Sequence, residues 1–242
     1  MNSQSNQYVK ESAILGTLLL TGLLGLGYFI SNSILTMKAM ERTVEVKGLS
    51  EREINADVAI WPITFNIAEN DLVKLSTVIK DKNTEVIKFL KSKGFDDSEV
   101  SISAPSTIDK LAREYDSVTN SAFRYSASST VTVYTNQVEK VKEARTQLGE
   151  LGKLGIAIGN DNNGMGTQYL YSKLNDIKPA MIEEATKNAR QTAEKFAKDS
   201  NSKLGKIRRA SQGTFSIEDR DSSTAYIKKV RVVSTVEYFL SD

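Results

Sequence analysis

The chain has 242 residues, with 32 basic and 30 acidic side chains and a net charge of +2, and it contains neither cysteine nor histidine. Balanced charge argues against a nucleic-acid partner, which attracts concentrated positive surface. Without cysteine or histidine there are no disulfides, thiolate nucleophiles, imidazole bases, or zinc, haem and copper sites built on these ligands.

The N-terminal region divides into a polar tail, residues 1–12, and an apolar stretch, residues 13–35. Residues 13–30 read AILGTLLLTGLLGLGYFI and carry no charge. Eighteen helical residues reach about 27 Å, and continuation to Leu35 exceeds the roughly 30 Å hydrocarbon core of a bilayer. Tyr28 and Phe29 stand near the end, where aromatic rings favour the headgroup region. We therefore predict a signal anchor that contacts the lipid bilayer through residues 13–35.

A cleaved signal peptide is the alternative, with secretion of the remaining chain to the periplasm. Ser31 and Ser33 would supply small residues around the cut. The apolar run, however, is longer than the usual 7 to 15 residues of the apolar region of a signal peptide. Lys10 is also the one basic side chain before it, whereas a signal peptide begins with a positively charged region. The sequence favours the anchor.

The charges that flank the span predict an orientation in the membrane opposite to the one implied by the family resemblance described below. Lys38, Arg42 and Lys47 follow the span, and Lys10 precedes it. Because basic residues flank the cytoplasmic end of a span, this bias places the C-terminal part inside the cell. The bias is only two or three residues, so the resemblance outweighs it here.

Two strands are predicted after the span. Val44 and Val46 alternate with polar residues, as in a half-buried strand, and Gly48 predicts a bulge or turn. Pro62 lies in the second strand and removes a backbone donor, which predicts an edge position or a bulge. One side of this second strand is apolar: Ala59, Trp61, Ile63, Phe65 and Ile67.

A helix and two further strands follow. Residues 71–93 are predicted to be helical, and Gly94 favours a stop. The strand around residues 100–104 ends at Pro105, residues 106–120 form a loop or hairpin, and a longer strand spans residues 123–133. The apolar face of the helix consists of Leu72, Leu75, Ile79, Val86 and Leu90.

The C-terminal half predicts two more helices and three strands. Residues 137–151 form a helix with Val138, Val141, Ala144 and Leu148 inward, and Tyr169 and Tyr171 share a strand face. Pro179 suits the first turn of a helix whose stripe is Ile182, Ala185, Ala189, Ala193 and Phe196. Strands at 207–217 and 230–240 close the chain, with Val230, Val232, Val236 and Tyr238 inward. The predicted fold class is α+β: an N-terminal transmembrane helix and one domain, residues 42–242, of largely antiparallel strands packed with about three helices.

Several segments resemble the SIMPL (DUF541) family over roughly residues 42–242. They are TVEVKG at 43–48, Asp57, the alanine-rich helix from Lys178 and Pro179 through Ala197, LGKI at 204–207, and KKVRVVSTVEYFL at 228–240. Ala56 stands where the family has a proline. The order and spacing of these segments carry the resemblance more than any one segment does.

The resemblance implies a bacterial inner-membrane protein with a single span and its C-terminal domain in the periplasm. It also implies self-association into a homo-oligomer, a link to stress tolerance in some members, and no agreed catalytic residues. We therefore expect a non-catalytic structural or interaction domain with no catalytic, cofactor-binding or metal residues and no cofactor. A periplasmic sensor or carrier of a small ligand is the alternative, and a hydrolase without histidine is a third hypothesis.

The loop Gly159–Gly166, GNDNNGMG, has a turn and a calcium interpretation. A calcium loop needs glutamate at its twelfth position, which counted from Asp161 is Ser172. Met165 and Gly166 replace the lysine and hydroxyl residue of a phosphate-binding loop. The sequence favours a turn.

Three clusters have both a functional and a structural interpretation. The basic cluster could bind phospholipid or nucleotide, or form solvated strand faces; the acidic cluster could be a carboxylate site or an exposed loop; the tyrosines could line a ligand cleft or pack in the core. The structural interpretation is favoured for each. The residues are Arg208, Arg209, Lys228, Lys229 and Arg231; Asp96, Asp97 and Glu99; and Tyr125, Tyr169, Tyr171 and Tyr238.

Overall fold

The computed structural model describes residues 2–39, 42–112, 122–159 and 166–241. Helix α1 (Asn2–Ala39) opens the chain, so residues 2–12 of the predicted polar tail are helical as well. Within α1, Leu15–Leu35 is long and apolar enough to cross a membrane, and none of this stretch is buried against other described residues. The predicted apolar helix is thus present.

The rest of the fold mixes helices with antiparallel strands, which confirms the α+β class. It forms two compact units: residues up to 50, 179–215 and 232–242, and residues 51–178 with 216–231. Strands β1 (Thr43–Asn55) and β9 (Ile227–Ser241) and helix α5 (Leu174–Asp199) each contribute to both units. The predicted division into a tail at residues 1–12, a span at 13–35 and one domain at 42–242 remains a prediction.

The first sheet has the order β1-β9-β7, with β8 also paired to β9. Strand β7 (Lys203–Gln212) pairs antiparallel with residues 234–241 of β9, and β8 (Ser216–Asp219) pairs with residues 228–231. The single strand predicted at 207–217 is therefore broken in two. Gly213 lies at the break, where its N–H donates to the Val233 carbonyl and an added Cβ would lie 2.7 Å from that oxygen.

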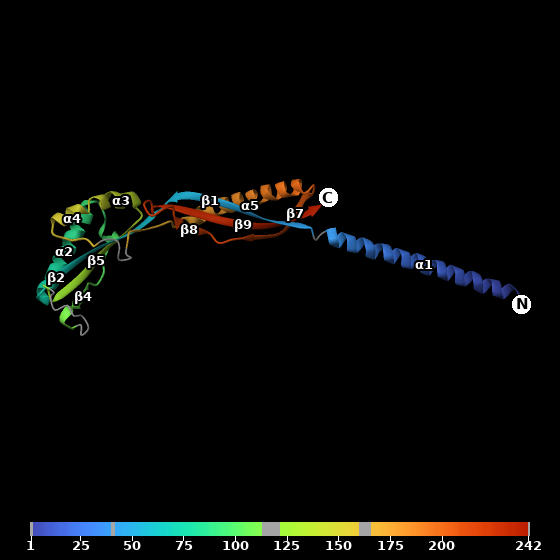
Figure 1. Cartoon of the computed structure of the whole chain (residues 1–242), viewed down its shortest axis with the longest axis horizontal. Helices are drawn as coiled ribbons and strands as arrows, with labels where there is room; N and C mark the ends of the chain where they lie inside the picture. Colours follow the sequence, from blue (N-terminus) through green and yellow to red (C-terminus); the bar gives the residue numbers. More distant parts are fainter. Residues whose placement is uncertain (1, 40–41, 113–121, 160–165, 242) are drawn as a thin grey trace. The chain divides into compact units, whose positions relative to one another are not determined.

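Helix α5 lies along this sheet (Figure 1). It packs on the sheet through small side chains. The buried row is Met181, Ala185, Ala189, Ala193 and Ala197. The predicted stripe was right in its three alanines and wrong at its ends, since Ile182 is half-buried and Phe196 is 56% exposed. The helix also begins at Leu174, so Pro179 lies inside it and not in its first turn.

Gly48 lies within β1, so the turn predicted there is wrong, whereas the alternative of a bulge remains a prediction. A Cβ on Gly48 would lie 1.9 Å from the Ala185 carbonyl oxygen and 2.4 Å from the Ala189 backbone nitrogen. Glycine is needed here because the α5 backbone comes this close to the strand. Beside it, buried Ser50 donates to Glu184 at 2.9 Å.

The second sheet has the order β3-β5-β2-β6, with β4 also paired to β5. Its strands are β2 (Val58–Glu69), β3 (Val100–Ile102), β4 (Ser106–Asp109), β5 (Tyr125–Thr135) and β6 (Gln168–Leu170). Strands β3 and β4 follow one another along the same side of β5, because β2 occupies its other side throughout. Strand β4 and the 3-10 helix η2 (Lys110–Ala112) begin the segment 106–120 predicted as a loop or hairpin, and β4 pairs antiparallel with β5. Residues 113–120 of that segment lie outside the described residues.

Three helices accompany this sheet: α2 (Leu72–Ser92), α3 (Val138–Thr146) and α4 (Gly149–Lys153). The predicted helix at 137–151 is thus divided into α3 and α4. Asp71 caps α2 by accepting from the Lys74 N–H at 2.8 Å, and Gly94 follows its end with φ +84°. Leu72 was predicted inward but is 51% exposed.

The core of the second unit centres on Trp61, Ile63 and Phe65 from β2, which pack with Val131 and Val133 from β5. Among the described residues, β2 is paired at Pro62 with β5 alone, because β6 pairs only with Val58–Ile60. Within that part of the chain, the missing donor of Pro62 therefore falls on an edge without a strand partner, as predicted.

Candidate functional site

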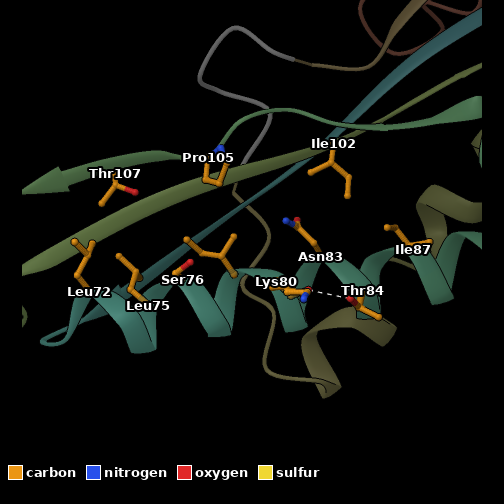
Figure 2. A pocket seen from close by; sticks show the side chains of 11 residues that line it. Leu72, Leu75, Ser76, Lys80, Asn83, Thr84, Ile87, Ile102, Pro105 and Thr107 are labelled. Carbon is orange, nitrogen blue, oxygen red and sulfur yellow. Dashed lines mark hydrogen bonds between the residues drawn. The ribbon is translucent and has the colours of Figure 1, made fainter.

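A groove of about 590 Å³ lies between α2 and the β3–β4 edge of the second sheet (Figure 2). Leu75 and Ile79 form its apolar floor and are 1% and 6% exposed. Its two sides are the outer flank of α2, with Leu72, Ser76, Lys80, Thr84 and Ile87, and the sheet, with Ile102, Pro105 and Thr107. Leu72 and Ile102 stand at the rim, 51% and 49% exposed.

Two nitrogen groups in this groove are available to a ligand. Asn83 is 8% exposed, its Oδ1 accepts from Ser129 at 2.9 Å, and its Nδ2 has no hydrogen-bond partner among the described residues. In Figure 2 this side chain reaches from α2 toward the sheet. Lys80 is the one charged side chain in the lining, and within the described ranges it forms no ion pair.

The strand edge beside the groove is open. Ser103 N–H donates to Thr130 and Lys110 N–H donates to Arg124, both at 3.0 Å and both toward β5. Because backbone groups in an antiparallel strand alternate in direction, those of Ile102 and Thr107 point away from β5. No described strand pairs with this side of β3 or β4. Pro105 interrupts the edge between them.

The first sheet also ends in open edges, since β1 and β7 each have one strand neighbour in the described part of the chain. Strand β7 carries four basic residues, Lys203, Lys206, Arg208 and Arg209, and no acidic one. Strand β1 carries three acidic residues against two basic ones. The two edges therefore differ in charge.

A second groove, of about 770 Å³, lies between α5 and β7. Tyr238 lies in it with Arg190 and Lys206. Burial raises the pKa of Tyr238, so the phenol, which is neutral at pH 7 even at its ordinary pKa, stays protonated to higher pH and can donate a hydrogen bond.

The predicted basic cluster is largely divided among ion pairs. Arg208 pairs with Glu237 and Lys229 with Glu51, each at 2.8 Å, so these residues are solvated strand faces as expected. Lys228 is different, because it is only 7% exposed and pairs with Asp219. The strand-face interpretation was wrong for Lys228, since its position faces the interior of the fold.

The predicted acidic cluster stabilises a turn. Glu99 accepts from the Asp96 N–H at 3.0 Å and from the Thr135 hydroxyl, within the 3-10 helix η1 (Asp97–Glu99). Burial raises the pKa of Glu99, but the hydrogen bonds from Thr135 and from the Asp96 backbone outweigh it and leave that pKa lowered. Asp97 pairs with Lys91 at 2.8 Å.

The four predicted tyrosines occupy separate environments. Tyr169 packs edge-to-face on Tyr226 with ring centroids 6.1 Å apart, and Tyr125 lies beneath the Arg124 guanidinium. Tyr171 follows β6, and its hydroxyl donates to the Lys173 carbonyl. These three belong to the second unit, and Tyr238 belongs to the core of the first.

The GNDNNGMG segment lies outside the described residues except at Gly159 and Gly166. In the ranges that the structure describes, no group of three or more acidic side chains is arranged to hold a metal. The groove beside α2 was not predicted from the sequence. The one residue that could have indicated it is Asn83, a polar residue four positions after Ile79 on the inward row of α2.

A family model described as SIMPL, protein of unknown function (DUF541), matches residues 44–237. No curated protein matches the chain.

Proposed function

This chain belongs to the SIMPL family of proteins of unknown function (DUF541), and on that premise we propose that it is a membrane-anchored, non-catalytic interaction domain that associates with copies of itself. The observation that carries the proposal is the pair of open edges of the first sheet, one with four basic residues and no acidic one, and the other with three acidic and two basic residues. A bacterial inner-membrane location, a periplasmic domain and a role in stress tolerance follow from kinship and belong to the same proposal.

The anchor is supported by the surface of α1. Leu18 and Phe29 are 68% and 71% exposed, in a stretch of 21 residues. A continuous apolar surface of this kind is unfavourable in water and favourable in hydrocarbon. A signal sequence has a similar composition, so the retention of residues 13–35 in the mature protein separates the two.

Self-association is supported by the edges of β1 and β7. An open strand edge presents unpaired N–H and C=O groups that another strand can satisfy. Pairing β7 with β7 of another copy would oppose like charges, whereas pairing β7 with β1 of the next copy opposes unlike charges. Such a head-to-tail contact uses two different surfaces and builds rings or filaments.

Sedimentation of the detergent-solubilised full chain tests this contact. We expect wild type to sediment as an oligomer at micromolar concentration and Lys206→Glu to dissociate it, because the charge reversal opposes acidic β1. Adding Glu45→Lys restores the opposite signs and should restore association. Lys88→Glu, an equal charge change on α2, is the control and should leave the oligomer intact. A wild-type monomer, or equal sedimentation of Lys206→Glu and wild type, contradicts the proposal.

The groove between α5 and β7 favours a second candidate, a carrier of a small ligand. Its size suits a small molecule. Tyr238, Lys206 and the guanidinium of Arg190, whose Nε pairs with Glu194 at 3.1 Å, offer donors to an anionic group, and Glu183 is the one acidic residue in the described lining. Native mass spectrometry of freshly purified protein would reveal a co-purifying ligand. We expect Tyr238→Phe to weaken retention of such a ligand, and an absence of any bound species disfavours this candidate.

A further inference from the structure

We propose that the groove between α2 and the β3–β4 edge binds an extended segment of a partner protein, whose groove-facing side chains are apolar apart from one carboxylate against Lys80. The segment would add a strand to the second sheet. This inference rests on the proposed interaction role but not on self-association, which uses the other sheet.

The first argument for strand addition is the direction of the backbone groups along β3 and β4. Ile102 and Thr107 both line the groove and direct their free backbone groups away from β5. A strand that pairs with them places every second side chain on the same face of the sheet, over the flank of α2. Recognition of peptides by strand addition has this form: main-chain hydrogen bonds bind, and pockets for alternate side chains select.

The dimensions define the length of the segment. Leu72 and Ile87 lie fifteen positions apart on α2, which is about 22 Å at about 1.5 Å per residue. An extended chain rises about 3.3 Å per residue, so about six or seven residues cover the groove. Pro105 has no N–H and interrupts the edge, so pairing is confined to short runs on either side of it.

The polar groups define the chemistry of the occupant. The Nδ2 of buried Asn83 is a donor without a described partner, and the Lys80 ammonium is the one charge in the lining. Both are donors, so the complementary ligand supplies acceptors. A peptide carbonyl suits Asn83, and a carboxylate suits Lys80. The apolar side chains of the segment would cover Leu75 and Ile79.

Fluorescence anisotropy with the full chain in detergent tests the proposal. The probe is a fluorescein-labelled heptapeptide with aspartate at position four, valine at positions two and six, and threonine elsewhere. We expect saturable binding, and we expect about a two- to tenfold loss of affinity when the aspartate is replaced by lysine. Lys80→Glu should reverse this preference, whereas the matched control Lys88→Glu on the same helix should keep it.

Two N-methylated probes test the strand geometry. Methyl groups on the odd or on the even positions remove alternate backbone donors, and only one set faces β3 and β4. We expect one form to lose binding and the other to keep it. Equal affinity of all probes, or no binding of the aspartate probe, would overturn the proposal. A change in sedimentation of Lys80→Glu without a change in peptide binding would assign the groove to a second copy and overturn it as well.

Failure here is separable from failure of the proposed self-association. Lys206→Glu alters the first sheet and should leave peptide affinity unchanged. Lys80→Glu should leave the oligomer unchanged.

Discussion

Replacing Gly48 with alanine should loosen α5 from the first sheet. The new Cβ would lie 1.9 Å from the Ala185 oxygen, 2.4 Å from the Ala189 nitrogen and 2.9 Å from the Ala189 Cβ. The two shortest contacts are with helix backbone, so no side-chain rotation relieves them. The buried row of α5 leaves no space for the helix to shift either, because Ala185, Ala189 and Ala193 are fully buried. Overpacking of this kind costs about 1 to 3 kcal/mol.

Hydrogen exchange resolved by peptides measures this loss where it occurs. A loss of about 1 to 3 kcal/mol corresponds to a fall of about 5- to 150-fold in the protection of α5 amides. Gly152→Ala is the matched control, since nothing lies within 4 Å of a Cβ at this position in α4. Alanine there should be neutral or stabilising by up to about 1 kcal/mol. Unchanged protection of α5 in Gly48→Ala would refute the close-packing argument.

Three further predictions concern the second unit. Hydrogen bonds from the Thr224 hydroxyl and then from the Arg220 side chain lower the pKa of Asp221 from 3.8 to about 2. The stabilisation this carboxylate gives is therefore present above pH 3.8 and lost as pH falls toward 2; a carboxyl NMR titration should have its midpoint near 2, and a midpoint near 3.8 contradicts the turn geometry. Asp219→Ala leaves the buried Lys228 ammonium without its ion pair and should destabilise by about 1.5 to 3 kcal/mol in urea unfolding followed by Trp61 fluorescence. Lys228→Met keeps the volume without the charge and should be nearly neutral; equal losses in these two variants would show that the ion pair is not what Lys228 contributes.

The sequence predicted the elements whose pattern is local. The alternation in β2 and the inward valines of β9 are such cases, because each strand face is buried as its spacing requires. The row of alanines in α5 was also recognised. The ends of this row were not recognised, because Ile182 and Phe196 are as apolar as Met181 and Ala197. The buried residues recur every four positions because the helix lies so close to the sheet, and the sequence does not show that approach.

Features that depend on distant parts of the chain were missed. Gly48 was predicted to form a bulge or turn because glycine weakens a strand, but glycine is required there by the α5 backbone about 140 positions later in the chain. The groove beside α2 depends on how β3 and β4 share one side of β5 around Pro105. Hydrophobic periodicity carries no information on that pairing, so neither the groove nor the role of Asn83 was predicted.

The intact mass of the mature protein in washed membranes tests the membrane-anchored account most directly. Membranes from cells that produce the chain would be washed with alkaline carbonate, and the retained protein would be analysed by mass spectrometry. The account predicts a protein in the washed membrane with the mass of the whole chain, 26.7 kDa, and residues 13–35 still present. A mature chain that begins after Ser33, or recovery of the protein in the carbonate wash, would contradict it.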